Sequence, residues 1–558
     1  MLAIHPQYLS LSKLLDGRLF RIPEYQRAYS WTSHQRQDLF GDIRRMHSKG
    51  PEEGHFMAAV VCLRRSKQTL GTDEFHVVEV VDGQQRLTTL IILLNCIKLE
   101  LNKEDKAEEK LARELGELLV KTEGDELLLL QTNHDSSQHF ATFLRKGTAQ
   151  PSNIAKMIAD REILKCIEDC REFIFGWIKT TDTLSSLAAL LKNRLFFLLH
   201  EIEDERSVYT VFEVLNSRGL DVSWMDRLKS ILMGNAFELQ NTNTAGLIAD
   251  LHTFWRDIYG IIGLRQGLST EALRFGATLK MQEAPSRPLG EQDSVDVMRL
   301  GAGSAKQIRD TASWLLRVTQ ACDTVMANPR INAVTRISQA RLLATAIYLR
   351  EDIEGEERDE LLAGWEKVSF RIYGMLRNDA RTRVGEYVRL AWRVTNEDLS
   401  VNEIGEAIRD IGTEFPIKTA TEFLRGKNCY EGWESQLRYF MFRYEEHLSA
   451  MQKLNFSNEQ WEKIWMVSPS ESIEHILASS SASDKVRHRL GNLLILPPKL
   501  NSTLQDDAPK HKAKAYRKTG LLVAGEVADT IESHSWNKKL IEDRETALLE
   551  WAAMEWAD

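Results

Sequence analysis

The sequence predicts a mainly α-helical protein with small mixed α/β parts, one near each end of the chain. Three observations lead to this prediction. Apolar residues recur at three- and four-residue spacing over most of residues 105–450, which is typical of amphipathic helices. Val-rich runs at 55–65 and 75–83 end in turn residues, as strands do. Residues 473–502 contain two short apolar runs separated by a Ser-rich loop, which indicates strand, loop and strand, followed by a helix from about Asp507 to Lys518.

Length and composition describe a folded protein of several domains. A chain of 558 residues exceeds what one hydrophobic core usually holds. A content of 43% hydrophobic and 27% charged residues is that of a globular protein. We expect three domains, at 1–235, 236–429 and 430–558, and loops near 240–244 and 284–303. The aromatic residues of the helical middle are expected to form helix–helix core rather than platforms for nucleic-acid bases.

The chain carries no sign of membrane insertion or export. It has no run of about 18 uncharged apolar residues, and its first residues lack the pattern of a signal peptide. The six cysteines are scattered, which suits reduced thiols in the cytoplasm. Cys166 and Cys170 have helical spacing, and we expect a buried pair rather than a metal site because no second Cys/His pair accompanies them.

The charge is unevenly distributed. The whole chain has a formal net charge of −9, whereas residues 485–518 contain nine Lys or Arg and two Asp. Such a window is either a solvated face or a surface for nucleic-acid phosphate, and its overlap with a motif described below favours phosphate. The candidate DNA contacts are Lys485, Arg487, Arg489, Lys499, Lys512 and Lys514.

A turn after the second predicted strand has the residues of an anion site. The strand delivers Asp82 to a turn at Gly83, and a helix then opens with Gln84 and Gln85. Helix N-termini bind phosphate through free N–H groups, and an Asp at the end of a strand suits a magnesium ion. Arginines clamp phosphate in bidentate fashion, and the candidates are Arg27, Arg86 and Arg218. The alternative is that Asp82 caps the helix and the arginines form surface ion pairs. No GxxxxGK[ST] motif occurs, which excludes a P-loop enzyme.

Four segments together resemble a known family. They are residues 22–31 (IPEYQRAYSW), 81–87 (VDGQQRL), 212–219 (FEVLNSRG) and 226–229 (DRLK). In order and spacing they are similar to the domain family of unknown function numbered 262. The resemblance covers residues 8–235 and implies a ParB-like or sulfiredoxin-like core that binds and hydrolyses nucleoside triphosphates, as the regulatory half of GmrSD-type restriction enzymes. It makes nucleotide-site candidates of Gln26, Arg27, Asp82, Gly83, Gln84, Gln85, Arg86 and Arg218.

The C-terminal apolar runs carry groups suited to phosphodiester cleavage, which needs a base to activate water and a cation to offset charge on the leaving oxygen. Glu474 and His475 are adjacent at the end of a predicted strand, so their side chains diverge. Asn492 lies seventeen residues after His475, and Asn501 nine residues further on. A single histidine in an apolar run is more often a core residue, and this alternative stays open from the residues alone.

The order acidic residue, His, Asn, Asn resembles the HNH nucleases, and more closely the domain family numbered 1524, with its EHILP and LGNLTLL segments. The matching span is about 430–535. The resemblance implies that His475 is the general base, that Glu474 and Asn501 are magnesium ligands, and that Asn492 fixes the loop that orients the histidine. Asp506 and His511 are weak candidates for a third ligand. The family's Pro after EHIL is Ala478 here, from which we expect altered geometry rather than lost activity.

Together the resemblances predict an anti-phage defence enzyme of type IV. It is expected to cut or nick modified double-stranded DNA, glucosylated or phosphorothioated, under the control of GTP, ATP or UTP. We expect Mg²⁺ or another divalent cation as cofactor and weak, steeply salt-dependent nonspecific DNA binding. A homodimer is one assembly we consider. Two alternatives remain: a nucleotide-gated DNA-binding switch with a degenerate nuclease, which Ala478 favours, and a general NTPase of stress signalling, for which the basic window is incidental.

Overall fold

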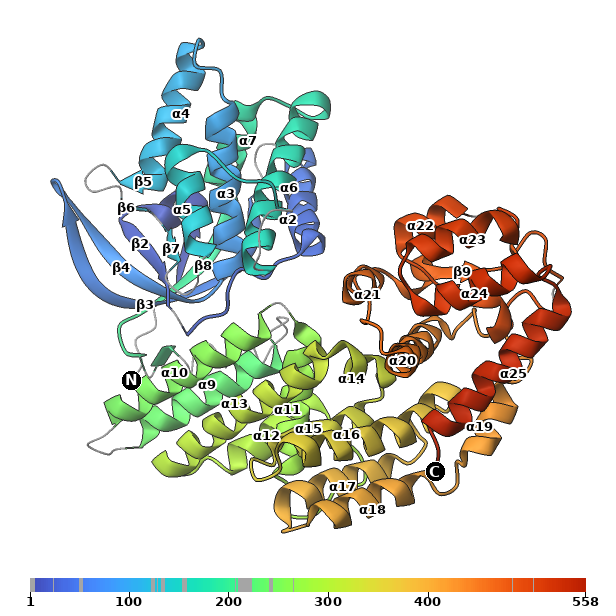
Figure 1. Ribbon diagram of the computed structural model, residues 1–558. Coiled ribbons are helices and arrows are strands. Elements are labelled where there is room, and N and C mark those ends of the chain that lie inside the picture. The colour runs from blue at the N-terminus through green and yellow to red at the C-terminus, as the bar shows by residue number, and fades with distance from the viewer. Residues whose placement is uncertain are drawn as a thin grey trace. The chain divides into compact units, whose positions relative to one another are not determined.

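The computed structural model (Figure 1) divides into two compact units. Unit 1 comprises Met1–Ala277 and Gly290–Gln320, and unit 2 comprises Thr278–Leu289 and Ala321–Asp558. The division into three domains, at 1–235, 236–429 and 430–558, remains a prediction. The structure describes residues 6–23, 25–49, 54–121, 126–127, 129–131, 136–152, 158–205, 207–208, 223–239, 244–263, 265–483, 485–504 and 506–558.

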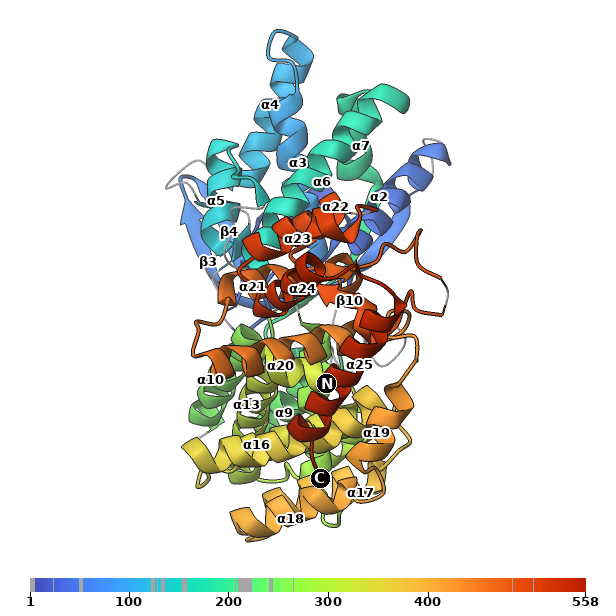
Figure 2. The same ribbon diagram turned by 45° about the vertical axis from the view of Figure 1, so that its right-hand side comes forward.

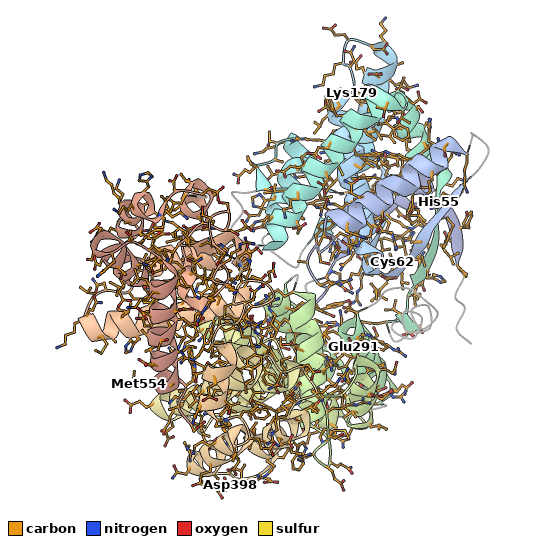
Figure 3. The ribbon with its side chains drawn as sticks, turned by 90° about the vertical axis from the view of Figure 1, so that its right-hand side faces the viewer. His55, Cys62, Lys179, Glu291, Asp398 and Met554 are labelled. Carbon is orange, nitrogen blue, oxygen red and sulfur yellow. The ribbon has the colours of Figure 1, made fainter. Side chains whose placement is uncertain are left out.

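A mixed six-stranded sheet forms the centre of unit 1. Its order is β1-β8-β3-β4-β2-β7, with β3 antiparallel to β4 and parallel to β8. The long pair β3–β4 covers the two predicted Val-rich strands, and His55 and Cys62 mark positions along β3 in Figure 3. The bounds are β1 Gln7–Ser10, β2 Arg18–Ile22, β3 His55–Leu70, β4 Asp73–Asp82, β7 Leu129–Gln131 and β8 Leu195–Ile202, with a separate pair β5 Val120–Lys121 and β6 Glu126–Leu127.

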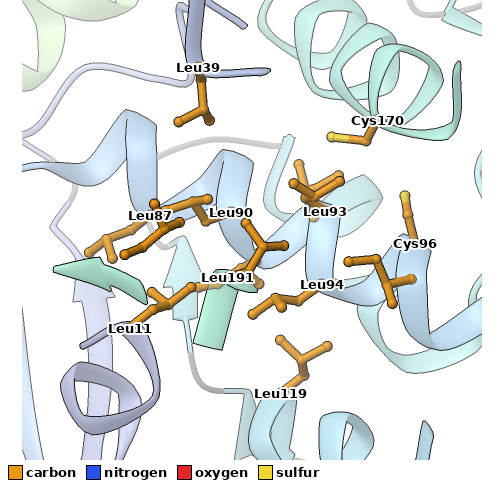
Figure 4. Close-up of a cluster of buried hydrophobic side chains, with 14 of the residues drawn as sticks. Leu11, Leu39, Leu87, Leu90, Leu93, Leu94, Cys96, Leu119, Cys170 and Leu191 are labelled. Carbon is orange, nitrogen blue, oxygen red and sulfur yellow. The ribbon is translucent and has the colours of Figure 1, made fainter. Parts of the chain in front are cut away.

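Helices pack against this sheet around α3 (Gln84–Glu100), which begins where β4 ends. Helix α3 is buried on nearly every face, because its Leu and Ile residues run around the helix rather than along one stripe. Figure 4 shows Leu87, Leu90 and Leu94 of α3 among leucines of α1, α4 and α7. The other helices here are α1 Leu11–Leu15, α2 Ser33–Ser48, α4 Lys106–Leu119, α5 Ser136–Lys146, α6 Ile158–Thr180 and α7 Leu184–Arg194.

The remaining helices of unit 1 follow the sheet in sequence. They are α9 Trp224–Glu238, α10 Thr244–Ile262, α11 Gln266–Leu279, α12 Glu291–Leu300 and α13 Ala305–Ala327. The last two residues of α11 and the last seven residues of α13 belong to unit 2. Helix α12 occupies half of the segment that the sequence predicted as a loop at 284–303, so that prediction is wrong for 291–300. Residues 240–243 of the other predicted loop lie outside the described residues.

Unit 2 is a helical body with one small strand pair, and Figure 2 shows α22, α23 and α24 gathered around β10. Strand β9 (Ile473–His475) pairs antiparallel with β10 (Leu493–Ile495). The other elements are α14 Pro329–Val334, α15 Ser338–Leu349, α16 Gly355–Ser369, η2 Phe370–Met375, α17 Val384–Asn396, α18 Val401–Gly412, α19 Ile417–Leu424, α20 Glu434–Gln452, α21 Asn458–Trp465, η3 Pro469–Ser472, η4 Leu490–Asn492, α22 Pro498–Leu504, α23 Pro509–Lys518, α24 Leu522–Ser533 and α25 Lys538–Glu555.

The core of unit 2 is rich in aromatic rings. Phe440 of α20 meets Trp551 and Trp556 at centroid distances of 5.2 and 5.3 Å. Trp365 and Trp433 are also fully buried. These rings hold helices together, as the sequence predicted.

The prediction of a mainly helical protein with a small mixed sheet is confirmed. Among the described residues, no helix is both long enough and apolar enough to span a bilayer.

Candidate functional site

The strand pair β9–β10 positions the two C-terminal candidates. His475 faces Leu493 across the pair and Glu474 faces Leu494. Because side chains alternate along a strand, the carboxyl group and the imidazole leave opposite faces. Glu474 is only 3% exposed, whereas His475 is half-buried. The acid is therefore enclosed by the fold, and the histidine is the more accessible of the two.

Helix α23 supplies the partners of Glu474. Lys512 Nζ lies 2.7 Å from Glu474 Oε1, and the Tyr516 hydroxyl donates to the same oxygen at 2.8 Å. The two residues are four apart and so share one face of the helix. Burial raises the pKa of Glu474, and the Lys512 ammonium opposes this effect. Lys512 also donates to the backbone oxygen of His475 at 2.8 Å, so one buried ammonium holds both residues of the pair.

A second imidazole accompanies His475. Its Nε2 lies 3.0 Å from His488 Nδ1, and the Tyr430 ring meets both histidines. Burial, followed by the effects of His488 and Lys512, lowers the pKa of His475 to about 4. A histidine with that pKa is neutral at pH 7, which is the state in which an imidazole accepts a proton.

Asn492 ties the loop that follows His475. It is fully buried, accepts the Leu477 N–H at 2.9 Å, and donates to the carbonyl groups of Leu477 and Arg487 at 3.1 and 3.0 Å. The Trp536 indole approaches the same amide oxygen at 3.4 Å. The two ends of the loop are thus held by one side chain. Ala478, in place of the family's Pro, is buried within this loop.

Asn501 lies on α22 (Pro498–Leu504), a short helix that the sequence did not predict, whereas the helix predicted from about Asp507 is α23. Asn501 Nδ2 donates to the carbonyl groups of Glu471 and Ile473, at 2.9 and 3.0 Å. Ile473 begins the strand that ends in His475, and two residues of strand span about 7 Å. These contacts place Asn501 beside that strand. Both contacts use the amide nitrogen.

The oxygens of Glu474 and Asn501 suit a magnesium ion, which often takes one or two protein ligands and completes its shell with phosphate and water. Among the described residues there is no cluster of three or more His, Cys, Asp or Glu able to hold a metal. Asp506 accepts from Ser480, and His511 is exposed. Glu474 and Asn501 are the oxygen donors that could hold such an ion, and Oε1 of Glu474 is engaged by Lys512 and Tyr516 in this structure.

The basic window divides into exposed and enclosed residues. Lys485, Lys499 and Lys514 are exposed, and Arg487 is partly exposed. Lys512 has no exposed surface, so its assignment as a DNA contact is corrected to an internal ion pair. Arg489 is 16% exposed and is bound by Glu542 and Glu545, which removes it from the DNA set for the same reason.

In unit 1, three glutamines of the predicted nucleotide site bind backbone. Gln26 donates to Val81 O at 3.3 Å and Gln84 to Arg27 O at 3.2 Å. Gln85 donates to Ala28 O and accepts from Ser30 N–H. All three are buried. They fix the 26–30 segment against the start of α3, so their side chains hold the fold of this site.

The turn between β4 and α3 requires glycine. Gly83 caps α3 with a φ of 94°, and a Cβ there would lie 3.1 Å from a methyl group of Val60. Burial raises the pKa of Asp82, while the Gly83 N–H and the guanidinium groups of Arg86 and Arg27 oppose this effect. The structure thus brings Arg27, Asp82 and Arg86 near one helix N-terminus. Arg218 lies outside the described residues.

A buried charge cluster stands next to this turn. Asp226 of α9 lies 3.8 Å from Arg27 and accepts a short hydrogen bond from Tyr259. Lys229, one turn further, is buried and donates to Tyr25 O at 3.0 Å. Burial lowers the pKa of Lys229 to about 7. The 226–229 segment of the sequence therefore serves to hold the 25–27 segment.

A pocket of ≈ 470 Å³ lies beside the same segment. Its lining combines guanidinium groups with one carboxylate, and the rings of Tyr25 and His252 stack at 4.0 Å. None of the residues predicted for nucleotide binding is among the described residues that line it. The lining is Arg21, Pro23, Tyr25, Arg65, Glu79, Ala249, His252, Thr253 and Arg256.

Comparison with known families decides the identity of the chain. Residues 11–233 match the model of the N-terminal domain of GmrSD restriction endonuclease. Residues 416–551 match the model of the C-terminal domain of GmrSD restriction endonucleases. The chain belongs to the GmrSD-type, type IV restriction enzymes. No curated protein matches it.

The GmrSD assignment makes the chain a restriction nuclease, and the Asp82 turn and the β9–β10 site lie within the matched ranges. Sequence reasoning missed His488 and Tyr430, which stand against His475, and missed Tyr516 as a partner of Glu474. No signal in the sequence distinguishes His488 from a surface histidine, because the contact depends on how the 477–487 loop closes.

Proposed function

We propose that this GmrSD-type enzyme is an anti-phage endonuclease or nickase acting on modified foreign double-stranded DNA in the cytoplasm. Its C-terminal region would be a metal-dependent HNH nuclease, regulated by nucleoside triphosphate in the N-terminal region. The observation that carries the proposal is the half-buried imidazole of His475 at the end of β9, next to Glu474, with the loop that follows it tied by Asn492. The order β9, β10, α22 is also that of a ββα-metal nuclease.

The proposed chemistry is hydrolysis of a phosphodiester. His475 takes a proton from water while the water oxygen forms a bond to phosphorus, and the bond from phosphorus to the leaving oxygen breaks. Asn492 keeps the loop after β9 closed so that the imidazole holds its position. Glu474 and Asn501 would hold Mg²⁺ or another divalent cation. When bound, that cation supplies positive charge that offsets the charge developing on the leaving oxygen.

We further propose that unit 1 binds GTP, ATP or UTP. The start of α3 offers backbone N–H groups, with Arg27 and Arg86 nearby, and such helix N-termini favour phosphate. Asp82 lies at the same turn and suits a magnesium ion that accompanies the nucleotide. We also propose that the core of unit 1 has a ParB-like or sulfiredoxin-like fold. The mixed sheet with α3 at the end of β4 supports it.

One cleavage experiment tests the proposal as a whole. Unmodified, glucosylated and phosphorothioated DNAs are incubated with the full chain and Mg²⁺, with or without each of the three nucleotides. Cleavage of at least one modified DNA, with a rate that changes on addition of a nucleotide, is expected. Equal cleavage of every DNA would refute recognition of a modification, and a rate indifferent to all nucleotides would refute the regulation.

A second candidate is a nucleotide-gated DNA-binding switch whose nuclease is degenerate. Two observations favour it: Ala478 departs from the family pattern, and the Lys512 ammonium already pairs with Glu474. Tight binding of a modified DNA with no cleavage at any concentration of divalent cation would select this function. Cleavage that disappears with EDTA would exclude it.

A further inference from the structure

His475 does not stand alone at the end of β9. His488 Nδ1 lies 3.0 Å from His475 Nε2, with the ring centroids 5.1 Å apart and the ring planes inclined at 66°. Tyr430 packs on both rings: its ring stacks on His488 at 5.1 Å and meets the edge of His475 at 4.8 Å. The contact between the two histidines is therefore a built feature of the site, enclosed by a third ring.

The second imidazole is also held by its backbone and its neighbours. The His488 carbonyl accepts the Cys429 N–H at 2.7 Å. On one side Asn492 binds the Arg487 carbonyl, and on the other side Arg489 is locked by Glu545. Contacts from three separate parts of the chain therefore hold the backbone around His488.

A hydrogen bond between His475 Nε2 and His488 Nδ1 can run in either of two directions, because a neutral imidazole has one N–H donor and one nitrogen that accepts. If His488 Nδ1–H donated to His475 Nε2, the only lone pair of His475 would be occupied, and it could not take a proton from water in this conformation. If His475 Nε2–H donates instead, His475 Nδ1 keeps its lone pair. Only the second arrangement leaves His475 able to act as a base.

We propose that His488 is a positioning residue for the nuclease reaction, whose Nδ1 accepts the Nε2 proton of His475 and so selects the basic tautomer of that residue. This inference rests on the proposed function. In the reaction the water proton moves to His475 Nδ1, the remaining hydroxide oxygen bonds to phosphorus, and the leaving oxygen departs with its electron pair and is protonated by solvent. The imidazolium that forms keeps its Nε2–H bonded to His488 Nδ1, which holds the orientation of the ring.

Two substitutions at one position separate the acceptor from the ring. His488→Phe keeps an aromatic ring against Tyr430 but has no acceptor, whereas His488→Asn loses the ring but offers an amide oxygen where Nδ1 stood. Rates of DNA cleavage are measured with the full chain beside His475→Ala. We expect His488→Phe to lower kcat about 10- to 100-fold, with KM for DNA unchanged within about twofold. His488→Asn should stay within about fivefold of the wild type.

Each outcome has a consequence. If His475→Ala is inactive while His488→Phe equals the wild type, the inference is wrong and the proposed base stands. If His475→Ala retains full activity, the proposed function itself fails. Equal losses in the Phe and Asn variants, or a change in KM alone, also overturn the inference. Should His488→Phe fail to fold, as judged by its melting temperature, His488→Ala replaces it, and restoration of cleavage by added imidazole is the expected result; no restoration would contradict the inference.

Discussion

Breaking the buried Glu474–Lys512 ion pair should have a large effect on the free energy of unfolding. The two charges lie 2.7 Å apart, with side chains 4% and 0% exposed. Removing one partner of such a buried pair leaves the other charge uncompensated and costs about 3–5 kcal/mol. Lys512→Met additionally leaves the His475 carbonyl without its donor, which adds about 1 kcal/mol. Glu474→Gln still accepts from Tyr516 but strands a buried ammonium.

A double-mutant cycle measures the coupling. Lys512→Met, Glu474→Gln and the double variant are unfolded in urea, and the free energies of unfolding are compared. We expect Glu474→Gln to lose about 3–5 kcal/mol and Lys512→Met about 4–6 kcal/mol, and the double variant to lose markedly less than the sum, with a coupling of about 3 kcal/mol. Lys514→Met is the matched control, because this lysine lies on the same helix and is exposed. Additivity within about 0.5 kcal/mol would refute the buried pair.

Three further predictions concern other parts of the chain. The pKa of Lys229 is about 7 in the folded chain and about 10.4 in the unfolded chain. Below pH 7 the buried ammonium therefore destabilises the fold, and this penalty is relieved as the pH rises from 7 to 10. The stability of the wild type relative to Lys229→Met should therefore rise between pH 7 and 10, by up to about 1.4 kcal/mol per pH unit in denaturation experiments, and a flat difference would contradict the burial of its ammonium. Gly491→Ala places a Cβ 1.9 Å from the Ile541 carbonyl and should cost about 3 kcal/mol or more in urea unfolding, whereas Gly525→Ala in α24, with open space around it, should cost nothing; equal effects would show that the close approach is not real. Replacing Lys485, Lys499 and Lys514 together by Ala should reduce the slope of log Kd against log salt for DNA by about 2 to 3, while Lys463→Ala, whose ammonium pairs with Glu459, should leave it unchanged. An unaltered slope in the triple variant would show that the three exposed lysines do not contact DNA phosphate.

Much of the fold could be predicted where the chain pattern is local. The strands at 55–65 and 75–83 were readable because Val-rich runs ended in turn residues, and α3 followed directly from Gly83. Strand β8 was missed because residues 195–202 form an apolar run directly after helix α7, and such a run has no clear period. Helix α12 was missed because the Gly and Pro residues around it suggested a loop.

In the candidate site, too, local features could be predicted from the sequence and contacts between distant residues could not. Glu474 and His475 could be placed on opposite faces because strand alternation is a local property. The role of Lys512 could not be predicted, because counting charges in a window does not tell an exposed lysine from an enclosed one. His488 escaped notice for a similar reason: thirteen residues separate it from His475, and only the closure of the loop by Asn492 brings the rings together.

The central claim is that the imidazole of His475 is the base of a DNA nuclease. Its most direct test is the rate at which the full chain and its His475→Ala variant nick supercoiled plasmid carrying the recognised modification, in Mg²⁺ and nucleotide. The melting temperature of each protein serves as the control for folding. We predict that nicking by the variant falls about 100-fold or more while its melting temperature is retained. Equal nicking by the two proteins would contradict the account.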